Sequence, residues 1–303
     1  MSMIAGPREA QKVVEVDGAR ERRSDGASIV VDRSGVGPFI THLILEEPSG
    51  RRLLWGSRRN RKGLDPEPVD LVGRSRPRSA LPIYIDSLTW WMAVLFMVGS
   101  ALFAVGAASV LVGASLVAKS GRIFFVGSIF FTSAAYFQFL EVVNEPDALT
   151  KQRPPASLWR WEPHKIAWCS SAIQLLGTLL FNMSTFEAMR SLSPTNQDRF
   201  VWAPDAIGSI CFLIASYLAW AEVCRRWFSW QPRNISWWVV LIGLCGSLAF
   251  GVSAVASLVI VGTGDLLDAY EANLWTLAGA ICFFVQAYLL LPEMTAKTQP
   301  ESP

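Results

Sequence analysis

The sequence is poor in the residues from which metal centres and disulfide frameworks are built. It contains five cysteines and two histidines in 303 residues. The histidines, His42 and His164, lie outside the apolar runs, and neither has a second ligand at metal-binding spacing. All five cysteines fall within or at the ends of apolar runs, where a thiol behaves as a small apolar side chain. The sequence therefore predicts no disulfide framework, no metal site and no cofactor.

The sequence also lacks the patterns of enzyme active sites. It has no nucleophile–base pair and no phosphate-binding loop, and no Lys, Arg, His or Asp lies near the middle of an apolar run. Ionisable groups at that depth are typical of proton relays and charged-substrate sites. A secretory signal is missing too, because the first thirty residues have no apolar core. We therefore expect a protein without enzymatic activity, whose first membrane helix is an uncleaved anchor.

What the sequence does contain is long apolar runs. Hydrophobic residues make up 51% of the chain and charged residues 17%. A helix needs roughly 20 apolar residues to cross a bilayer, and a soluble helix of that kind would have no polar face for water. The sequence predicts an all-α integral membrane protein with six transmembrane helices. They are expected at about 90–118, 123–143, 166–186, 206–223, 237–261 and 274–291.

The distribution of bases predicts the orientation of these helices. Six bases and no acid lie between Arg51 and Lys62, and further bases occupy the loops after the second and fourth runs. The loops on the opposite side are poorer in bases, and the last one, GTGDLLDAYEAN, has none. Because short basic loops stay in the cytoplasm, we expect both termini to be cytoplasmic.

Residues 1–86 form a separate cytosolic region. Residues 1–27 are polar and charged, which predicts a disordered tail. Residues 28–63 contain short strand patterns, with Pro48, Ser49 and Gly50 at the turn of a β-hairpin. Residues 64–86 have the composition of a Pro-rich linker that leads to the membrane.

The basic cluster of this region has two interpretations. It either binds anionic lipid headgroups, at roughly 1 kcal/mol per base near the surface, or only fixes orientation. Nucleic-acid binding is not expected, since acids nearly balance bases outside the cluster and no nucleic-acid-binding motif is present. The candidate headgroup residues are Arg51, Arg52, Arg58, Arg59, Arg61 and Lys62.

The even-numbered runs repeat one pattern three times. GSIFFTSAAYFQFLE, GSICFLIASYLAWAE and GAICFFVQAYLLLPE begin at Gly127, Gly208 and Gly279. Each has Phe four residues after the glycine, Tyr nine after it and Glu fourteen after it. The odd-numbered runs share GSALF, GTLLF and GSLAF, which begin at Gly99, Gly177 and Gly246.

The repeated unit is thus a helix hairpin that enters and leaves on one side of the membrane. Three copies make parallel repeats, which we assign to residues 87–144, 145–223 and 224–293, followed by a tail at 294–303.

Small residues and glutamates share one face of the repeated helices. Small-residue faces normally let helix backbones approach closely, and the alternative is a face that lines a substrate path. The candidate packing residues are Gly99, Gly127, Gly177, Gly208, Gly243, Ser247, Gly251 and Gly279. The glutamates, Glu141, Glu222 and Glu293, are either interfacial charges or a carboxylate ring that favours cations at the cytoplasmic mouth.

The paired hairpins resemble the YrhK-like family of small bacterial membrane proteins. The likeness rests on a Trp-led helix with G-S/T-x-x-F, joined to a second helix with G-S/A-x-x-F and a small-Tyr pair. It covers residues 90–293 as repeated copies, whereas the N-terminal extension departs from the minimal hairpin. The resemblance implies a bacterial membrane location and brings no reaction or ligand with it.

Two classes of function follow. The first is a non-enzymatic scaffold, sensor or envelope component, whose N-terminal region meets lipid or a protein partner that the sequence does not identify. The second is a small channel or transporter for a cation or small solute, built from three hairpins around a pseudo-threefold axis. A polar track between the hairpins would favour transport, and a dry centre packed with Gly and Phe would favour the scaffold. The absence of charge at mid-membrane depth favours the scaffold.

Overall fold

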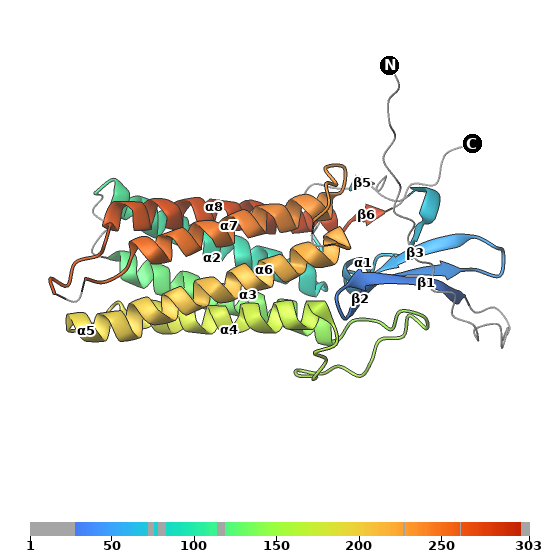
Figure 1. Ribbon diagram of the computed structural model, residues 1–303, viewed down its shortest axis with the longest axis horizontal. Helices are drawn as coiled ribbons and strands as arrows, with labels where there is room; N and C mark the ends of the chain where they lie inside the picture. Colours follow the sequence, from blue (N-terminus) through green and yellow to red (C-terminus); the bar gives the residue numbers. More distant parts are fainter. Residues whose placement is uncertain are drawn as a thin grey trace, which may run out of the picture.

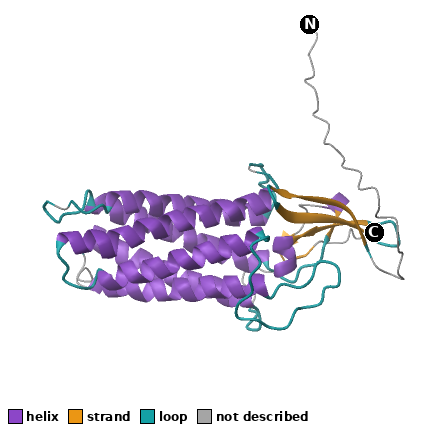
Figure 2. Cartoon of the chain, turned by 60° about the horizontal axis from the view of Figure 1, so that its bottom comes forward, coloured by secondary structure: helices purple, strands orange, loops and turns teal. Residues whose placement is uncertain are grey.

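The computed structural model describes residues 28–71, 76–77, 83–113, 119–226, 228–260 and 262–297. The tail predicted at 1–27 therefore lies outside the described residues. The described chain is elongated, with long helices side by side at one end and a small sheet at the other (Figure 1). A view turned by 60° shows the same division (Figure 2).

Within the described residues, six helices are long and apolar enough to cross a membrane, as in a multi-pass membrane protein. They follow the predicted runs, because each run supplies the uncharged length that a span requires. The first and fifth helices, however, end at Leu111 and Ala256, before the ends expected near residues 118 and 261. Their bounds are α2 Leu88–Leu111, α3 Ser120–Val143, α4 Ile166–Glu187, α6 Ala203–Cys224, α7 Ile235–Ala256 and α8 Ala269–Glu293.

The fourth span differs from its prediction at its start. The short helix α5 (Pro194–Gln197) and a π-helical turn (Asp198–Trp202) run without a break into α6. The resulting span, Pro194–Cys224, is 31 residues long. The apolar run predicted a start at about residue 206, because Arg199 and Asp205 interrupt the sequence before it.

The six long helices form a closed ring in chain order. Each one packs against the helix before it and the helix after it, and α8 packs against α2 to close the ring. The loops after α3 and α6 lie at the end that carries the sheet, which we call the sheet end (Figures 1 and 2).

Glycines bring the two helices of each hairpin close together. A Cβ atom on Gly99 would lie 3.1 Å from the carbonyl oxygen of Gly127, and one on Gly127 would lie 3.2 Å from that of Gly99. The pairs Gly177–Gly208 and Gly246–Gly279 make the same approach at 3.1–3.3 Å. The recurring contact agrees with the predicted packing role of these residues, while the internal repeat itself stays a prediction from the sequence.

The other small residues of α7 pack on different neighbours. A Cβ atom on Gly243 would lie 2.4 Å from Nε2 of Gln286 on α8, and one on Gly251 would lie 3.4 Å from Leu213 on α6. The Ser247 hydroxyl lies 2.7 Å from the hydroxyl of Ser216 on α6. This face of α7 therefore meets two helices.

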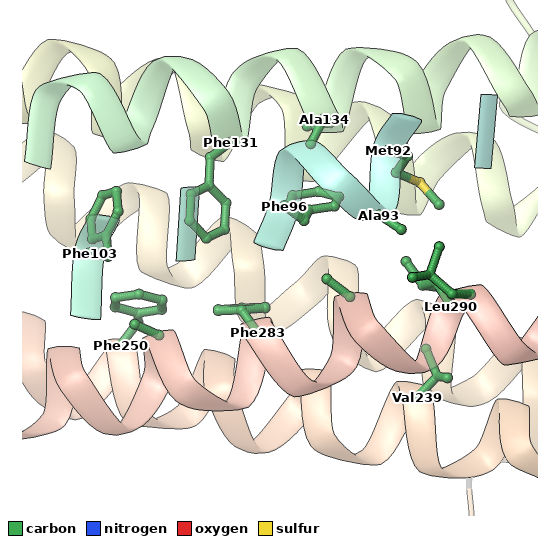
Figure 3. Close-up of a cluster of buried hydrophobic side chains, with 14 residues drawn as sticks. Met92, Ala93, Phe96, Phe103, Phe131, Ala134, Val239, Phe250, Phe283 and Leu290 are labelled. Atoms are coloured by element: carbon green, nitrogen blue, oxygen red, sulfur yellow. The ribbon is translucent and has the colours of Figure 1, made fainter. Parts of the chain in front are cut away.

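Phenylalanine fills the centre of the ring. Each long helix contributes the Phe that follows its motif glycine by four residues, and all six side chains are buried. Ring centroids of neighbouring members lie 4.9–6.1 Å apart, which is the range of favourable aromatic contacts. Figure 3 shows four of them, Phe103, Phe131, Phe250 and Phe283, pointing toward one another. The phenylalanine layer consists of Phe103, Phe131, Phe181, Phe212, Phe250 and Phe283.

The sheet at the other end has four antiparallel strands in the order β1-β2-β3-β4. They are β1 Ile29–Val36, β2 Phe39–Glu46, β3 Arg52–Gly56 and β4 Glu67–Pro68. β2 and β3 flank the turn expected at Pro48–Gly50, where Gly50 has a φ of +80° that glycine adopts without strain. The predicted linker contains β4, the 3₁₀ turn Val69–Leu71 and β5 (Arg76–Pro77), and β5 pairs with β6 (Ala296–Lys297) after α8.

Two features attach the sheet to the bundle. Val36, at the end of β1, is buried against Ile166 of α4 and Ala221 of α6. A five-residue helix, α1 (Ser57–Arg61), follows β3 and lies between the sheet and the bundle (Figure 1). The apolar contact and the short helix place the N-terminal bases over the ends of α3, α6 and α8.

Candidate functional site

The basic helix α1 faces carboxylates at the ends of two long helices. Glu222 occupies the last turn of α6, and Glu293 is the last residue of α8. A carboxylate at a helix C-terminus meets the negative end of the helix dipole, so each position is unfavourable without a nearby cation. The bases of α1 supply those cations.

Arg61 binds Glu222 through two parallel hydrogen bonds. Its Nη1 donates to Oε1 at 2.7 Å and its Nη2 donates to Oε2 at 3.0 Å. The Ser57 hydroxyl donates a further hydrogen bond to Oε1 of Glu222. Both side chains of the ion pair are buried, with exposed fractions of 7% and 3%. Such a bidentate pair fixes both the distance and the orientation of its partners.

Glu293 accepts hydrogen bonds from two bases. Arg58 donates from Nε at 2.7 Å and from Nη2 at 3.0 Å, and the ammonium of Lys62 donates to Oε2. The exposed fraction of the Lys62 side chain is 4%. Arg58 and Arg61 are three residues apart, so they lie on one face of the short helix and reach two different long helices.

Glu141 is buried at the end of α3 and has a different partner. Its Oε1 accepts a hydrogen bond from the Thr89 hydroxyl at the start of α2. No base lies within hydrogen-bond distance of it among the described residues, although its charge acts on Arg61 and Lys62. The structure thus brings the three predicted glutamates to one end of the bundle, with two of them ion-paired.

Three carboxylates and three bases make up what we call the charge cluster. It consists of Glu141, Glu222, Glu293, Arg58, Arg61 and Lys62. Burial lowers the pKa of Arg58 and Arg61, but the facing glutamates outweigh it and raise both above the usual range. For Lys62 burial dominates and lowers the pKa despite Glu293. A balanced cluster has no excess negative charge with which to attract a cation.

A small polar cavity of about 70 Å³ lies directly beneath the charge cluster. Its walls include the amides of Gln138, Gln174 and Gln286 and the hydroxyls of Ser170 and Ser216. Gln138 donates to Gln174 across the α3–α4 contact at 3.2 Å. A cavity of this size has room for a few water molecules. On its deeper side Phe283 and Phe96 close the cavity, and the phenylalanine layer follows.

The positions of these layers follow from helix geometry. In α3, α6 and α8 the motif phenylalanine precedes the glutamate by ten residues, which corresponds to about 15 Å along a helix. The bundle is therefore polar near the sheet end and packed with aromatic side chains further in.

Most of the six bases expected to face lipid headgroups instead pair with carboxylates of the protein. Arg58, Arg61 and Lys62 point into the charge cluster, and Arg59 pairs with Glu67 at 2.9 Å. Arg51 and Arg52 alone of the six are exposed, and Arg52 contacts Glu46 at 3.3 Å. The physical reason is that carboxylates at the ends of α6 and α8 compete with solvent and lipid for these bases.

Two tryptophan loops at the sheet end were not recognised in the sequence. Trp161–Trp168 and Trp230–Trp237 share the pattern W-x-P-x-x-I-x-W, and each pair packs edge to face at 4.6 and 4.9 Å. The second tryptophan of each pair donates its indole N–H to a carbonyl eight residues earlier, at 2.7 and 2.9 Å. The shared spacing was the available signal, and each pattern begins in a loop and ends at the start of an apolar run.

Comparisons with protein-family models, with curated proteins and with solved structures gave no match to this chain. The resemblance to the YrhK-like family therefore stays a prediction that rests on the hairpin motif. Among the described residues, no group of three or more His, Cys, Asp or Glu side chains has the arrangement of a metal site.

Proposed function

We propose that this chain is a non-enzymatic scaffold or sensor of a bacterial plasma membrane, with its sheet and both termini in the cytoplasm. In this role the six-helix bundle is the anchor and α1 holds the sheet in a fixed position on it. The observation that carries the proposal is the pairing of Arg58, Arg61 and Lys62 with Glu222 and Glu293.

The tightly packed centre of the bundle favours a scaffold over a channel or transporter. The six side chains of the phenylalanine layer are in ring contact with one another. Protein interiors packed in this way leave no space for water, and a hydrated ion needs a polar path through hydrocarbon. The cavity beneath the charge cluster ends at Phe283 and Phe96.

Reconstitution into liposomes tests the proposal. We expect vesicles that contain the full chain to pass K⁺, Na⁺ and protons no faster than empty vesicles. The variant with Glu141→Gln, Glu222→Gln and Glu293→Gln should also be impermeable, because a scaffold has no ion path past these glutamates. Flux through the wild-type chain that the triple variant abolishes would overturn the proposal and establish a carboxylate ring.

The polar cavity favours one second candidate, a channel or transporter that α1 closes. Amides, hydroxyls and Glu141 line the cavity directly below the bases of α1. In that case the variant with Arg58→Gln, Arg61→Gln and Lys62→Gln would conduct while the wild-type chain would not. The variant Arg51→Gln with Arg52→Gln is the matched control, since these exposed bases lie outside the charge cluster. The scaffold role predicts that neither variant conducts.

A further inference from the structure

A second and larger cavity lies between the sheet and the start of α7. Its volume is about 440 Å³, which is within the range of small-molecule sites. β2, β3, α1, the end of α6, Arg225 and residues 230–234 contribute its walls. Arg58, Lys62 and Glu222 line both this cavity and the small polar cavity, so the two cavities adjoin at α1.

The walls of this cavity carry an excess of positive charge. Five bases and three carboxylates line it, and His42 adds no charge because burial and the nearby Arg225 lower its pKa to about 3. The carboxylates, Glu67, Glu222 and Glu293, each have an α1 base as ion-pair partner. The remaining bases are Arg225 and Arg233.

These two arginines have no carboxylate at ion-pair distance among the described residues. Arg225 is half-buried at the C-terminus of α6, and its φ of +59° places it in the left-handed region that arginine rarely adopts. Burial lowers the pKa of its guanidinium, and Glu67 offsets this only in part. A partly buried guanidinium without a partner anion is unfavourable unless a ligand supplies one.

Further polar groups line the same cavity. Nε of Arg59 is buried and has no hydrogen-bond partner among the described residues. Asn234, the N-cap of α7, and Ser236 line the cavity, so the positive end of that 22-residue helix adds to the field. The Asn234 side chain already accepts the Ser236 N–H at 3.0 Å, and the Gln231 amide in the wall already donates to the Ser229 hydroxyl at 2.6 Å.

We propose that this cavity binds a phosphate-bearing anion through Arg225 and Arg233, against the first turn of α7. Guanidinium groups match phosphate oxygens in planar, two-point hydrogen bonds, which favours phosphate over a spherical anion. Phe228 and Trp230 in the adjoining loop are 70% exposed each. Exposed aromatic side chains beside the end of a membrane helix fit the headgroup region of a bilayer. The phosphate belongs either to the headgroup of an anionic phospholipid, as distinct from zwitterionic phosphatidylcholine, or to a small soluble phosphate compound.

The test uses the full chain in nanodiscs, with thermal unfolding and tryptophan fluorescence as readouts. One arm compares phosphatidylcholine nanodiscs with nanodiscs that also contain phosphatidylglycerol. The other arm titrates inorganic phosphate and glycerol 3-phosphate into the protein in pure phosphatidylcholine, against sodium chloride at matched ionic strength. A response in the first arm alone identifies a lipid headgroup, and a response in the second arm identifies a soluble phosphate. Both results support the site.

Variants distinguish phosphate binding in this cavity from a non-specific effect of positive charge. Arg225→Gln and Arg233→Gln each remove one guanidinium and should weaken binding about tenfold or more. Arg226→Gln removes the neighbouring base, which does not line the cavity, and should leave binding unchanged. Arg233 is exposed in a loop, so its variant remains informative if Arg225→Gln does not fold. No response in either arm, a response equal to that of sodium chloride, or equal binding in Arg233→Gln and Arg226→Gln overturns the proposal.

The inference does not depend on the scaffold role, because a phosphate site on the sheet side would exist equally in a channel. Absence of ion flux and absence of phosphate binding are separate results. Each is measured on the same reconstituted wild-type chain.

Discussion

Single carboxylates at the ends of the long helices determine where the N-terminal bases lie. Glu222 and Glu293 have exposed fractions of 2% each. Burying an ion pair has a desolvation cost that its attraction only partly offsets, so such pairs contribute more to a fixed arrangement than to stability. Removing one partner is different, because it leaves the other charge buried alone.

Replacement by glutamine should lower the free energy of unfolding more at the ion-paired Glu222 than at Glu141, which has no paired base. Glu222→Gln leaves the buried guanidinium of Arg61 without a counter-charge, and we expect a loss of about 3–5 kcal/mol in the free energy of unfolding. Glu141→Gln keeps an acceptor for the Thr89 hydroxyl and has no paired base, so its loss should stay within about 1 kcal/mol. Denaturant unfolding in detergent measures both. Equal losses would contradict the assignment of the ion pair.

His42 should make the attachment of the sheet sensitive to acid. Its pKa is lowered to about 3 by burial and by Arg225, while Glu222 acts in the opposite direction. Between pH 3 and the ordinary imidazole pKa of about 6.5, His42 binds a proton in the unfolded chain but not in the folded chain. Stability should therefore be constant above pH 6.5 and fall as the pH drops below it.

His42→Gln is the control for this prediction, because it removes the titrating ring and keeps a polar side chain. Unfolding curves at several pH values should show a weaker acid dependence in this variant than in the wild-type chain. Parallel dependences in both proteins would assign the acid sensitivity to other groups, such as Asp147, whose pKa is lowered by hydrogen bonds from the backbone N–H groups of Thr150 and Leu149.

At the scale of elements, apolar length made the long helices predictable. The third run, expected at 166–186, became α4 at Ile166–Glu187, and the second ended at Val143 as expected. The motif glycines also lie at helix contacts, which agrees with their expected packing role, whereas the buried phenylalanine layer was not predicted. α1 was not predictable in the same way, because five residues with three arginines have neither helical length nor an apolar face.

Glycine substitutions test the close approach within a hairpin. A Cβ on Gly99 would lie 2.8 Å from the ring of Phe131 and 3.1 Å from the carbonyl oxygen of Gly127. Gly99→Ala should therefore lower the free energy of unfolding by about 1–3 kcal/mol through overpacking. Gly251→Ala is the matched control, since its nearest contact is an ordinary 3.4 Å to Leu213 and alanine favours the helix. Unfolding in detergent compares the two variants, and a stabilised Gly99→Ala would contradict the contact.

At the scale of the whole molecule, the sheet and the bundle meet through charges that lie far apart in the sequence. Arg61 and Glu222 are separated by 161 residues, and Arg58 and Glu293 by 235. Sequence spacing carries no signal for such pairs. The sequence therefore indicated that the glutamates are interfacial charges or a carboxylate ring, and that the bases fix orientation or bind lipid headgroups. The structure unites them because the sheet packs on the ends of α4 and α6 through Val36 and brings α1 over the bundle.

The central claim is that α1 is held on the bundle by Glu222 and Glu293, and amide hydrogen exchange of residues 57–62 tests it most directly. In the full chain in nanodiscs, this segment should be protected, and Glu141→Gln should leave its protection nearly unchanged. Glu222→Gln combined with Glu293→Gln should accelerate exchange there about 100-fold, which corresponds to a loss of about 3 kcal/mol. A wild-type segment that exchanges as fast as an unstructured chain, or a double variant without effect, would contradict the account.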